Sequence, residues 1–191
     1  EPTRRDGRAA GAGTGVGKMR YDPLGAASYS EASQTLPKGW RLTTLSALTY
    51  HKSGNSKLIK GRLHKEPCAG LFPAFSASGQ DVWVDTPDFE GVAVIISAVG
   101  ARCGKAFLAK GSWSAIANTH IVWPREEMDP RYLWRVLNNE DFWVKGGSAQ
   151  PFIKTKATFE RPFPLPPLPE QRRIVARLET LEARSRRARE K

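Results

Sequence analysis

The sequence has little cysteine and no long hydrophobic run. Its two cysteines, Cys68 and Cys103, are far apart along the chain, and neither has a second cysteine or a histidine at metal-ligand spacing. The pattern indicates two reduced thiols, as in a cytosolic protein, rather than a zinc site or a disulfide framework. The longest apolar stretch, residues 92–99, is the size of a strand, whereas a membrane helix needs about 18 or more apolar residues. We therefore expect no bound metal, no cofactor and no membrane contact.

Sequence signatures of catalysis are also missing or incomplete. Residues 12–18 look like a phosphate-binding loop, but Met19 stands where that loop needs a serine or threonine, and Pro23 interrupts the helix that should follow. Three carboxylates between residues 85 and 90 come without the Glu-x-Lys of a metal-dependent nuclease. There is neither an Asp/Asn-Pro-Pro-aromatic motif of a DNA methyltransferase nor a Gly-x-Ser-x-Gly elbow. We expect a protein without a catalytic centre of its own.

Basic residues are in excess along most of the chain. The formal net charge is +11, of which residues 1–36 contribute +1 and residues 170–191 contribute +4. The remaining +6 belongs to the middle of the chain, so the excess is not confined to a tail. A basic globular domain suggests a polyanionic partner, most commonly a nucleic acid. The alternative is a basic surface that serves only solubility.

Three regions differ in composition. Residues 1–35 mix glycine, alanine and charged residues without apolar periodicity, which is typical of a flexible linker or connector. Residues 36–168 contain short strand-like runs, glycine turns and one helix start at Asp129-Pro130, which predicts a mixed, β-rich α+β domain with few helices. Five prolines within residues 162–169 predict a rigid, non-helical hinge. Residues 169–191 are expected to form a long C-terminal helix.

The C-terminal helix carries an apolar stripe among its arginines. Ile174, Leu178 and Leu181 are spaced four and three residues apart, with Val175 beside them. Such a stripe on a helix that leaves its domain predicts packing against a partner helix. An alternative use of this region is a polyproline ligand at residues 164–169, which would make the chain a protein-interaction module.

Four blocks, in this order and spacing, resemble a known family. They are Leu36-Pro37-Lys38-Gly39-Trp40, the glycine turn at residues 100–104, Gly147-Ser148-Ala149-Gln150-Pro151, and Pro164-Leu165-Pro166-Pro167-Leu168-Pro169-Glu170-Gln171-Arg172-Arg173-Ile174-Val175. Together they resemble the target-recognition domain and spacer helix of the DNA-specificity (S) subunit of type I restriction–modification systems. The resemblance extends from about residue 36 to the end of the sequence.

Residues 18–21 and the polar stretch after them resemble the connector before a second recognition domain of such a subunit. This favours the C-terminal half of a two-domain S subunit, and a start at Glu1 rather than Met fits a piece of a longer protein. A free-standing half-subunit is the alternative.

The resemblance implies partners and a division of labour. Each recognition domain would bind one half of a bipartite site in double-stranded DNA. The helices of two halves, in cis or in a homodimer, would pack as an antiparallel coiled coil that fixes the gap between the half-sites. Methyltransferase subunits, and through them a restriction subunit, would dock on this scaffold and carry the catalysis. The implied location is the cytoplasm of a bacterium or archaeon.

Exposed loops are the candidates for DNA contact. Arg102 and Gln150 are the expected base contacts, because arginine can pair with a guanine edge and glutamine with an adenine edge. The full predicted DNA-binding set is Lys57, Lys60, Arg62, Lys65, Arg102, Lys105, Ser148, Gln150, Lys154 and Lys156, with the first four contacting mainly phosphates. The predicted partner-helix contacts are Ile174, Val175, Leu178 and Leu181. The alternative is that this domain is the recognition part of a fused methyltransferase–nuclease restriction enzyme.

Overall fold

The strand β6 (Ala93–Ser97) is buried along its whole length and lies at the centre of the fold. The computed structural model describes residues 36–190, so the predicted linker 1–35, with its glycine-rich run at 12–18, lies outside the described residues. Successive side chains of a strand point to opposite faces. The apolar run in β6 therefore contributes to a different core on each side of its sheet.

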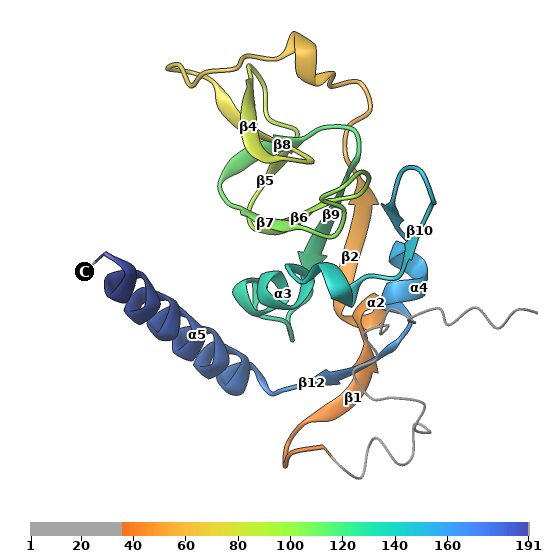
Figure 1. Ribbon diagram of the computed structural model, residues 1–191, viewed down its shortest axis with the longest axis vertical. Helices are drawn as coiled ribbons and strands as arrows, with labels where there is room; N and C mark the ends of the chain where they lie inside the picture. Colours follow the sequence, from red (N-terminus) through yellow and green to blue (C-terminus); the bar gives the residue numbers. More distant parts are fainter. Residues whose placement is uncertain (1–35, 191) are drawn as a thin grey trace, which may run out of the picture.

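Two four-stranded sheets form the upper part of the molecule (Figure 1). The first is antiparallel with the order β2-β9-β6-β7, and the second has the order β4-β3-β8-β5 with β3 and β8 parallel. The other strands of the first sheet are β2 (Thr49–Ser53), β7 (Ala106–Ala109) and β9 (Thr119–Pro124). The strands of the second are β3 (Phe72–Ser76), β4 (Gly79–Val84), β5 (Phe89–Glu90) and β8 (Ser112–Ala115).

The core has three parts. Between the sheets, Ile95 and Ile121 pack with Phe75 and the fully buried Trp113. The opposite face of the first sheet, with Val94, Ile96 and Val122, packs against the helices. The outer face of the second sheet is covered by two leucines of the loop between β2 and β3, Leu58 and Leu63. These leucines anchor a loop that is otherwise polar.

Helices and two small ribbons complete the domain. The helices are α2 (Leu45–Leu48), α3 (Pro130–Leu137), α4 (Thr155–Phe159) and α5 (Leu168–Arg189), with 3-10 turns at Lys60–Arg62 and Glu140–Phe142. The ribbons pair β1 (Arg41–Thr44) with β12 (Pro162–Leu165) and β10 (Lys145–Gly146) with β11 (Phe152–Ile153). The predicted α+β class, with many strands, few helices and a long C-terminal helix, is confirmed. None of the helices within residues 36–190 is long and apolar enough to cross a membrane.

Helix α3 begins where the sequence predicts. The Asp129 carboxylate accepts hydrogen bonds from the backbone N–H groups of Arg131 and Tyr132, at 2.9 and 3.1 Å, and Pro130 occupies the first turn. Tyr132, Leu133 and Leu137 are buried and turn its apolar face toward the first sheet.

The prediction of a non-helical segment over residues 162–169 is correct for residues 162–167 and wrong for Leu168 and Pro169, and most of the segment is a paired strand rather than a hinge. Residues 162–165 form the strand β12, which pairs with β1, and α5 begins at Leu168 with Pro169 in its first turn. Proline lacks a donor, but Pro162 and Pro164 occupy every second position, so Phe163 and Leu165 keep the N–H groups that face β1. A proline in the first helical turn loses no intrahelical hydrogen bond. Only residues 166 and 167 separate the strand from the helix.

Gln171 fastens the start of α5 to the domain. Its side chain is fully buried and makes three hydrogen bonds with the backbone. Its Oε1 accepts from the Asp129 N–H at 2.8 Å, and its Nε2 donates to the carbonyls of Glu127 and Pro166, both at 2.9 Å. These contacts, called here the Gln171 junction, connect α5 to the turn before α3 and to the end of β12. One side chain therefore ties three segments together.

Replacing Gln171 with leucine should destabilise the domain by about 2–4 kcal/mol, because it leaves the buried Pro166 carbonyl and the part-buried Asp129 N–H and Glu127 carbonyl without these partners. Urea denaturation followed by tryptophan fluorescence measures the change. The matched control is Gln80→Leu on β4, where the glutamine is exposed, and a loss within about 0.5 kcal/mol is expected there. Equal losses for both variants would contradict the role given to the junction.

Candidate nucleic-acid interface

The structure brings two of the predicted DNA-binding segments together. The Gly100 N–H donates to the Pro151 carbonyl at 2.8 Å, and Val99 forms a β-bridge with Phe152. The glycine turn at residues 100–105 and the loop at residues 147–151 are therefore neighbours. Arg102 on the first and Gln150 on the second are both exposed. We call this pair of segments the double loop.

The glycine turn has a well-defined backbone. Gly104 donates to the Ser97 carbonyl at 2.8 Å, and the Ser97 N–H donates to the Lys105 carbonyl at 2.9 Å, which closes the turn on the end of β6. Gly104 has a φ of +94°, and a Cβ there would be 2.6 Å from Cδ1 of Trp143. Glycine is thus required by conformation and by space. Cys103 is buried, while Arg102 points into solvent.

In the second loop of the pair, the backbone at Gly147 closely approaches the backbone at Gln150. Gly147 has a φ of +81°, and a Cβ there would be 2.2 Å from the Gln150 carbonyl oxygen. Ser148 and Gln150 are exposed at the tip, and Lys154 and Lys156 are exposed after it. Lys156 is 3.8 Å from Glu160, whereas Lys105 is half-buried with its ammonium 5.9 Å from the centre of the Phe107 ring.

The third predicted segment, the basic loop between β2 and β3, lies on the other sheet. It is at the top of Figure 1 and is fixed to β4 by backbone hydrogen bonds between His64 and Trp83, at 3.2 and 2.9 Å. Lys57, Arg62 and Lys65 are exposed. Lys60 instead forms an ion pair with Asp81 and donates to Ser76 Oγ at 3.2 Å. Its charge is therefore already balanced within the chain.

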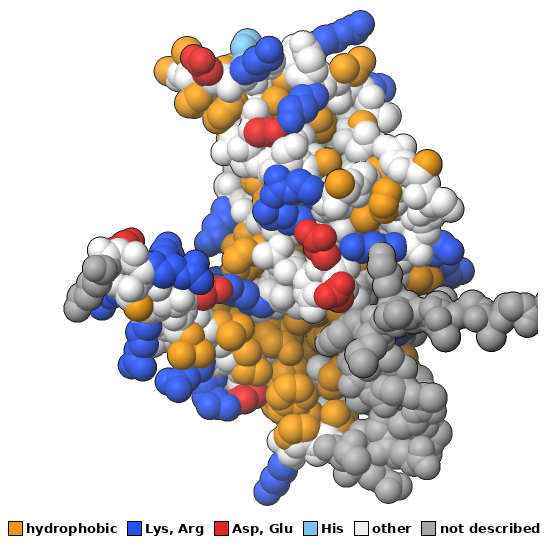
Figure 2. Space-filling view, in the orientation of Figure 1, with side chains coloured by type: hydrophobic (Ala, Val, Ile, Leu, Met, Phe, Trp, Pro, Cys, Tyr) orange, Lys and Arg blue, Asp and Glu red, His pale blue; other side chains and the backbone are white. Residues whose placement is uncertain are grey.

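On the face of the molecule seen in Figure 2, positive charge is distributed rather than gathered in one patch. In Figure 2, Lys and Arg side chains are spread over the sheets and along α5, with acidic side chains among them. His120 adds no charge at neutral pH: its burial, and secondarily the nearby His51, lower its pKa from the ordinary value. Its Nδ1 is buried without a hydrogen-bond partner in the described part of the chain.

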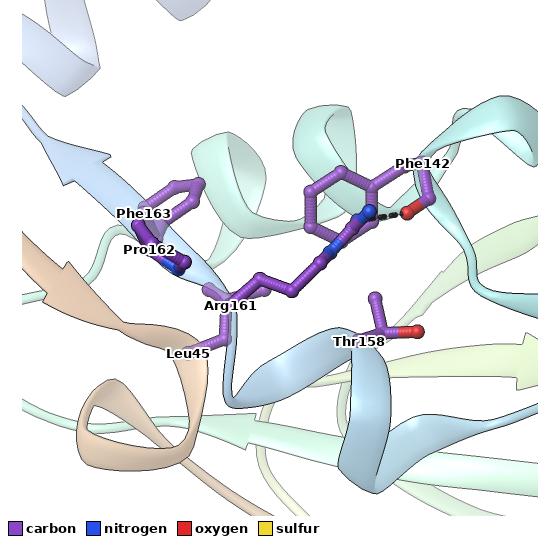
Figure 3. A pocket seen from close by; sticks show the side chains of 6 residues that line it. All are labelled: Leu45, Phe142, Thr158, Arg161, Pro162 and Phe163. Atoms are coloured by element: carbon purple, nitrogen blue, oxygen red, sulfur yellow. Dashed lines mark hydrogen bonds between the residues drawn. The ribbon is translucent and has the colours of Figure 1, made fainter. Parts of the chain in front are cut away.

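A shallow hollow beside α4 shows packing rather than a ligand site. Figure 3 shows the Arg161 side chain running across it from the end of α4 toward Phe142. The Arg161 guanidinium donates to the Phe142 carbonyl and lies 5.3 Å from the centre of the Phe142 ring. Within residues 36–190, no group of three or more His, Cys, Asp or Glu side chains is placed to hold a metal ion.

Part of the apolar stripe of α5 packs against the domain, and the other part is exposed to solvent. Val175 is buried in the domain's own core and Ile174 packs beside it, so Val175 is not available to a partner helix. Leu178 and Leu181 are 37% and 45% exposed. Two ion pairs fix the helix against α3: Arg135 grips the Glu182 carboxylate with both guanidinium nitrogens, and Arg131 lies 3.6 Å from Glu179. The Arg135 hydrogen bonds lower the pKa of Glu182.

In the sequence, Gln171 belongs to the motif at residues 164–175, and no separate role is predicted for it. It stands three and four residues before Ile174 and Val175, on the apolar side of the helix. A polar residue in an apolar stripe signals a buried hydrogen-bonding role, and this signal was present in the sequence.

Comparison with known proteins identifies the family to which this domain belongs. The family model for the type I restriction modification DNA specificity domain matches residues 82–190, and the chain belongs to this family. No match was found among curated proteins.

Solved structures with the same fold come from type I systems. A chain from a study of complex assembly and conformational transition of the type I R-M system is 25% identical, with a TM-score of 0.60 over 78% of this chain and 40% of that one. The S subunit from M. genitalium is 19% identical, with a TM-score of 0.59 over 76% and 39%. The HsdS subunit from Thermoanaerobacter tengcongensis is 22% identical, with a TM-score of 0.57 over 85% and 40%. The match therefore spans about two fifths of each of these chains.

Replacing Gly104 with alanine should destabilise the domain by about 1–3 kcal/mol more than replacing Gly100, because both have positive φ but only Gly104 faces Trp143. A Cβ at Gly100 meets nothing within 4 Å. Thermal unfolding of the two variants side by side measures the difference. A Gly104→Ala variant as stable as Gly100→Ala would show that the turn is not packed as described.

Proposed function

We propose that this chain is the DNA-binding and scaffolding part of a type I specificity subunit. Residues 36–168 act as a target-recognition domain that binds one half of a bipartite site, and residues 169–191 act as a spacer helix. Residues 1–35 serve as the connector. Methyltransferase subunits, in the cytoplasm of a bacterium or archaeon, dock on the scaffold and supply the chemistry, and a restriction subunit joins through them.

The observation that carries this proposal is the double loop. Arginine and glutamine are the side chains best suited to bidentate contacts with guanine and adenine edges. Here Arg102 and Gln150 are exposed on two loops joined by the Gly100–Pro151 hydrogen bond, in a chain of the DNA specificity family. Ser148 is exposed on the same loop as Gln150, Lys154 and Lys156 are exposed after that loop, and all three supply donors for phosphates. Lys105 supports the turn and contributes charge.

The basic loop supplies a second set of phosphate contacts. Lys57, Arg62 and Lys65 point into solvent, whereas Lys60 is held by Asp81. Lys60 therefore has a weaker role in this proposal than its three neighbours, because binding a phosphate requires breaking an existing ion pair.

Methylation mapping in cells that carry the complete system tests the base contacts. Arg102→Ala and Gln150→Ala should each change or relax the preferred sequence in one half of a bipartite motif, and leave the other half and the gap as they were. Each lost bidentate contact is worth about 1–3 kcal/mol of discrimination. A motif unchanged by both variants would overturn the base-contact role, and a continuous motif would instead favour the fused methyltransferase–nuclease.

Salt-dependent DNA binding tests the phosphate contacts. Arg62→Ala should weaken binding to all sequences and reduce the slope of log affinity against log salt by about 1. The matched control Lys60→Ala should change the slope less, because that lysine is paired with Asp81. If Lys60→Ala had the larger effect, the assignment of the two side chains would have to be reversed.

A further inference from the structure

Phe152 is an exposed aromatic side chain directly after the second segment of the double loop. It is 42% exposed, although its backbone is fixed on both sides. The carbonyl of Pro151 accepts from the Gly100 N–H at 2.8 Å, and the Ile153 N–H donates to the Ala98 carbonyl at 3.0 Å. Both neighbours of Phe152 are therefore bonded to the segment that leads into the glycine turn.

Two glycines make room for the Phe152 ring. A Cβ on Gly146 would be 2.8 Å from Cζ of the ring, and a Cβ on Gly147 would be 3.1 Å from its Cδ1. Side chains at these positions would compete with the ring for space. Lys154, which is also exposed, passes the same glycine, with its Cε 2.7 Å from the Gly146 Cβ position. The ring thus lies against the backbone of the β10–β11 ribbon, which protrudes at the edge of the domain in Figure 1.

The chemistry of a phenylalanine ring restricts what it can contact on DNA. The ring has no polar group, so it cannot hydrogen-bond to phosphates or to the polar edges of bases. The major groove offers one apolar group, the C5 methyl of thymine. Stacking of the ring on a base would require an unpaired base, whereas the proposed target is double-stranded. A thymine methyl is therefore the best match for Phe152.

The position of Gln150 relative to Phe152 favours an A·T pair. Glutamine is suited to adenine, and the thymine paired with that adenine presents its methyl group in the same groove. Two residues of extended chain span about 7 Å, and successive base pairs are about 3.4 Å apart along the helix axis. A contact from Phe152 can therefore fall on the pair contacted by Gln150 or on a neighbouring pair.

We infer that Phe152 contacts the C5 methyl group of a thymine in the half-site, at or next to the pair contacted by Gln150. The contact removes apolar surface of the ring and of the methyl group from water. Little side-chain freedom is lost, because the ring is already held against Gly146 and Gly147. The inference rests on the proposed function and adds a specificity-determining residue that recognises an apolar group rather than a hydrogen-bonding edge.

Replacing thymine with deoxyuridine tests this inference, because the replacement removes the C5 methyl and keeps the hydrogen-bonding edge. The probes are duplexes with the bipartite site known from the methylation map, each with one thymine replaced. Their binding to the complete specificity–methyltransferase complex is measured by fluorescence anisotropy. With the natural chain, replacement at one A·T pair should weaken binding about three- to tenfold. With Phe152→Ala, binding to the thymine duplex should weaken by a similar factor, and the same replacement should have no further effect.

Two variants serve as controls. Phe152→Leu keeps an apolar side chain and should keep part of the effect of the methyl group. Tyr50→Ala removes another exposed aromatic side chain, on β2, and should leave that effect unchanged. The inference is refuted if no deoxyuridine replacement weakens binding to the natural chain, if the effect persists in full in Phe152→Ala, or if the half-site has no A·T pair. None of these results would affect the methylation-map test of Arg102, which concerns hydrogen-bonding edges.

Discussion

The arrangement of this domain depends on the buried amide of Gln171. A buried polar side chain is tolerated only when its donors and acceptors are satisfied, and here the backbone satisfies them from two sides of the helix start. The same amide supplies partners for backbone groups in the turn before α3 and at the end of β12. If α5 swung away, several buried groups would lose partners at once. The direction of the helix is therefore coupled to the folding of the domain.

This coupling connects the double loop, proposed to contact DNA, with α5, the proposed spacer helix. Helix α3 packs on the face of β6 that carries Val94 and Ile96, and β6 leads directly into the glycine turn that presents Arg102. The chain of contacts from the double loop to α5 thus runs through one close-packed core. The ion pairs from Arg131 and Arg135 extend the attachment along α5 to Glu179 and Glu182, beside the exposed Leu178 and Leu181. A rigid path of this kind is what a protein needs if it is to hold a bound half-site at a fixed position relative to a partner.

Local signals in the sequence predict a large part of this structure. The Asp129-Pro130 helix start, the apolar run of β6 and the glycine turn all depend on neighbouring residues, and they appear as expected. What could not be predicted depends on residues distant in sequence. Lys60, in the loop between β2 and β3, is paired with Asp81 on β4, and Gln171 contacts residues 127 and 129, more than 40 positions earlier. The strand over residues 162–165 forms because β1 pairs with it, although its composition predicts a hinge.

Rigidity between the recognition surface and α5 is the central claim, and a distance measurement tests it most directly. Spin labels at Lys110→Cys, between β7 and β8, and at Ser185→Cys on α5 can be placed in a Cys68→Ser background, since both sites are exposed and Cys103 is buried. Pulsed electron spin resonance on the free chain should give one narrow distance distribution, and the Gln171→Leu variant should broaden it. A broad distance distribution in the labelled chain that keeps Gln171 would contradict the account, because α5 could then not fix the position of a partner.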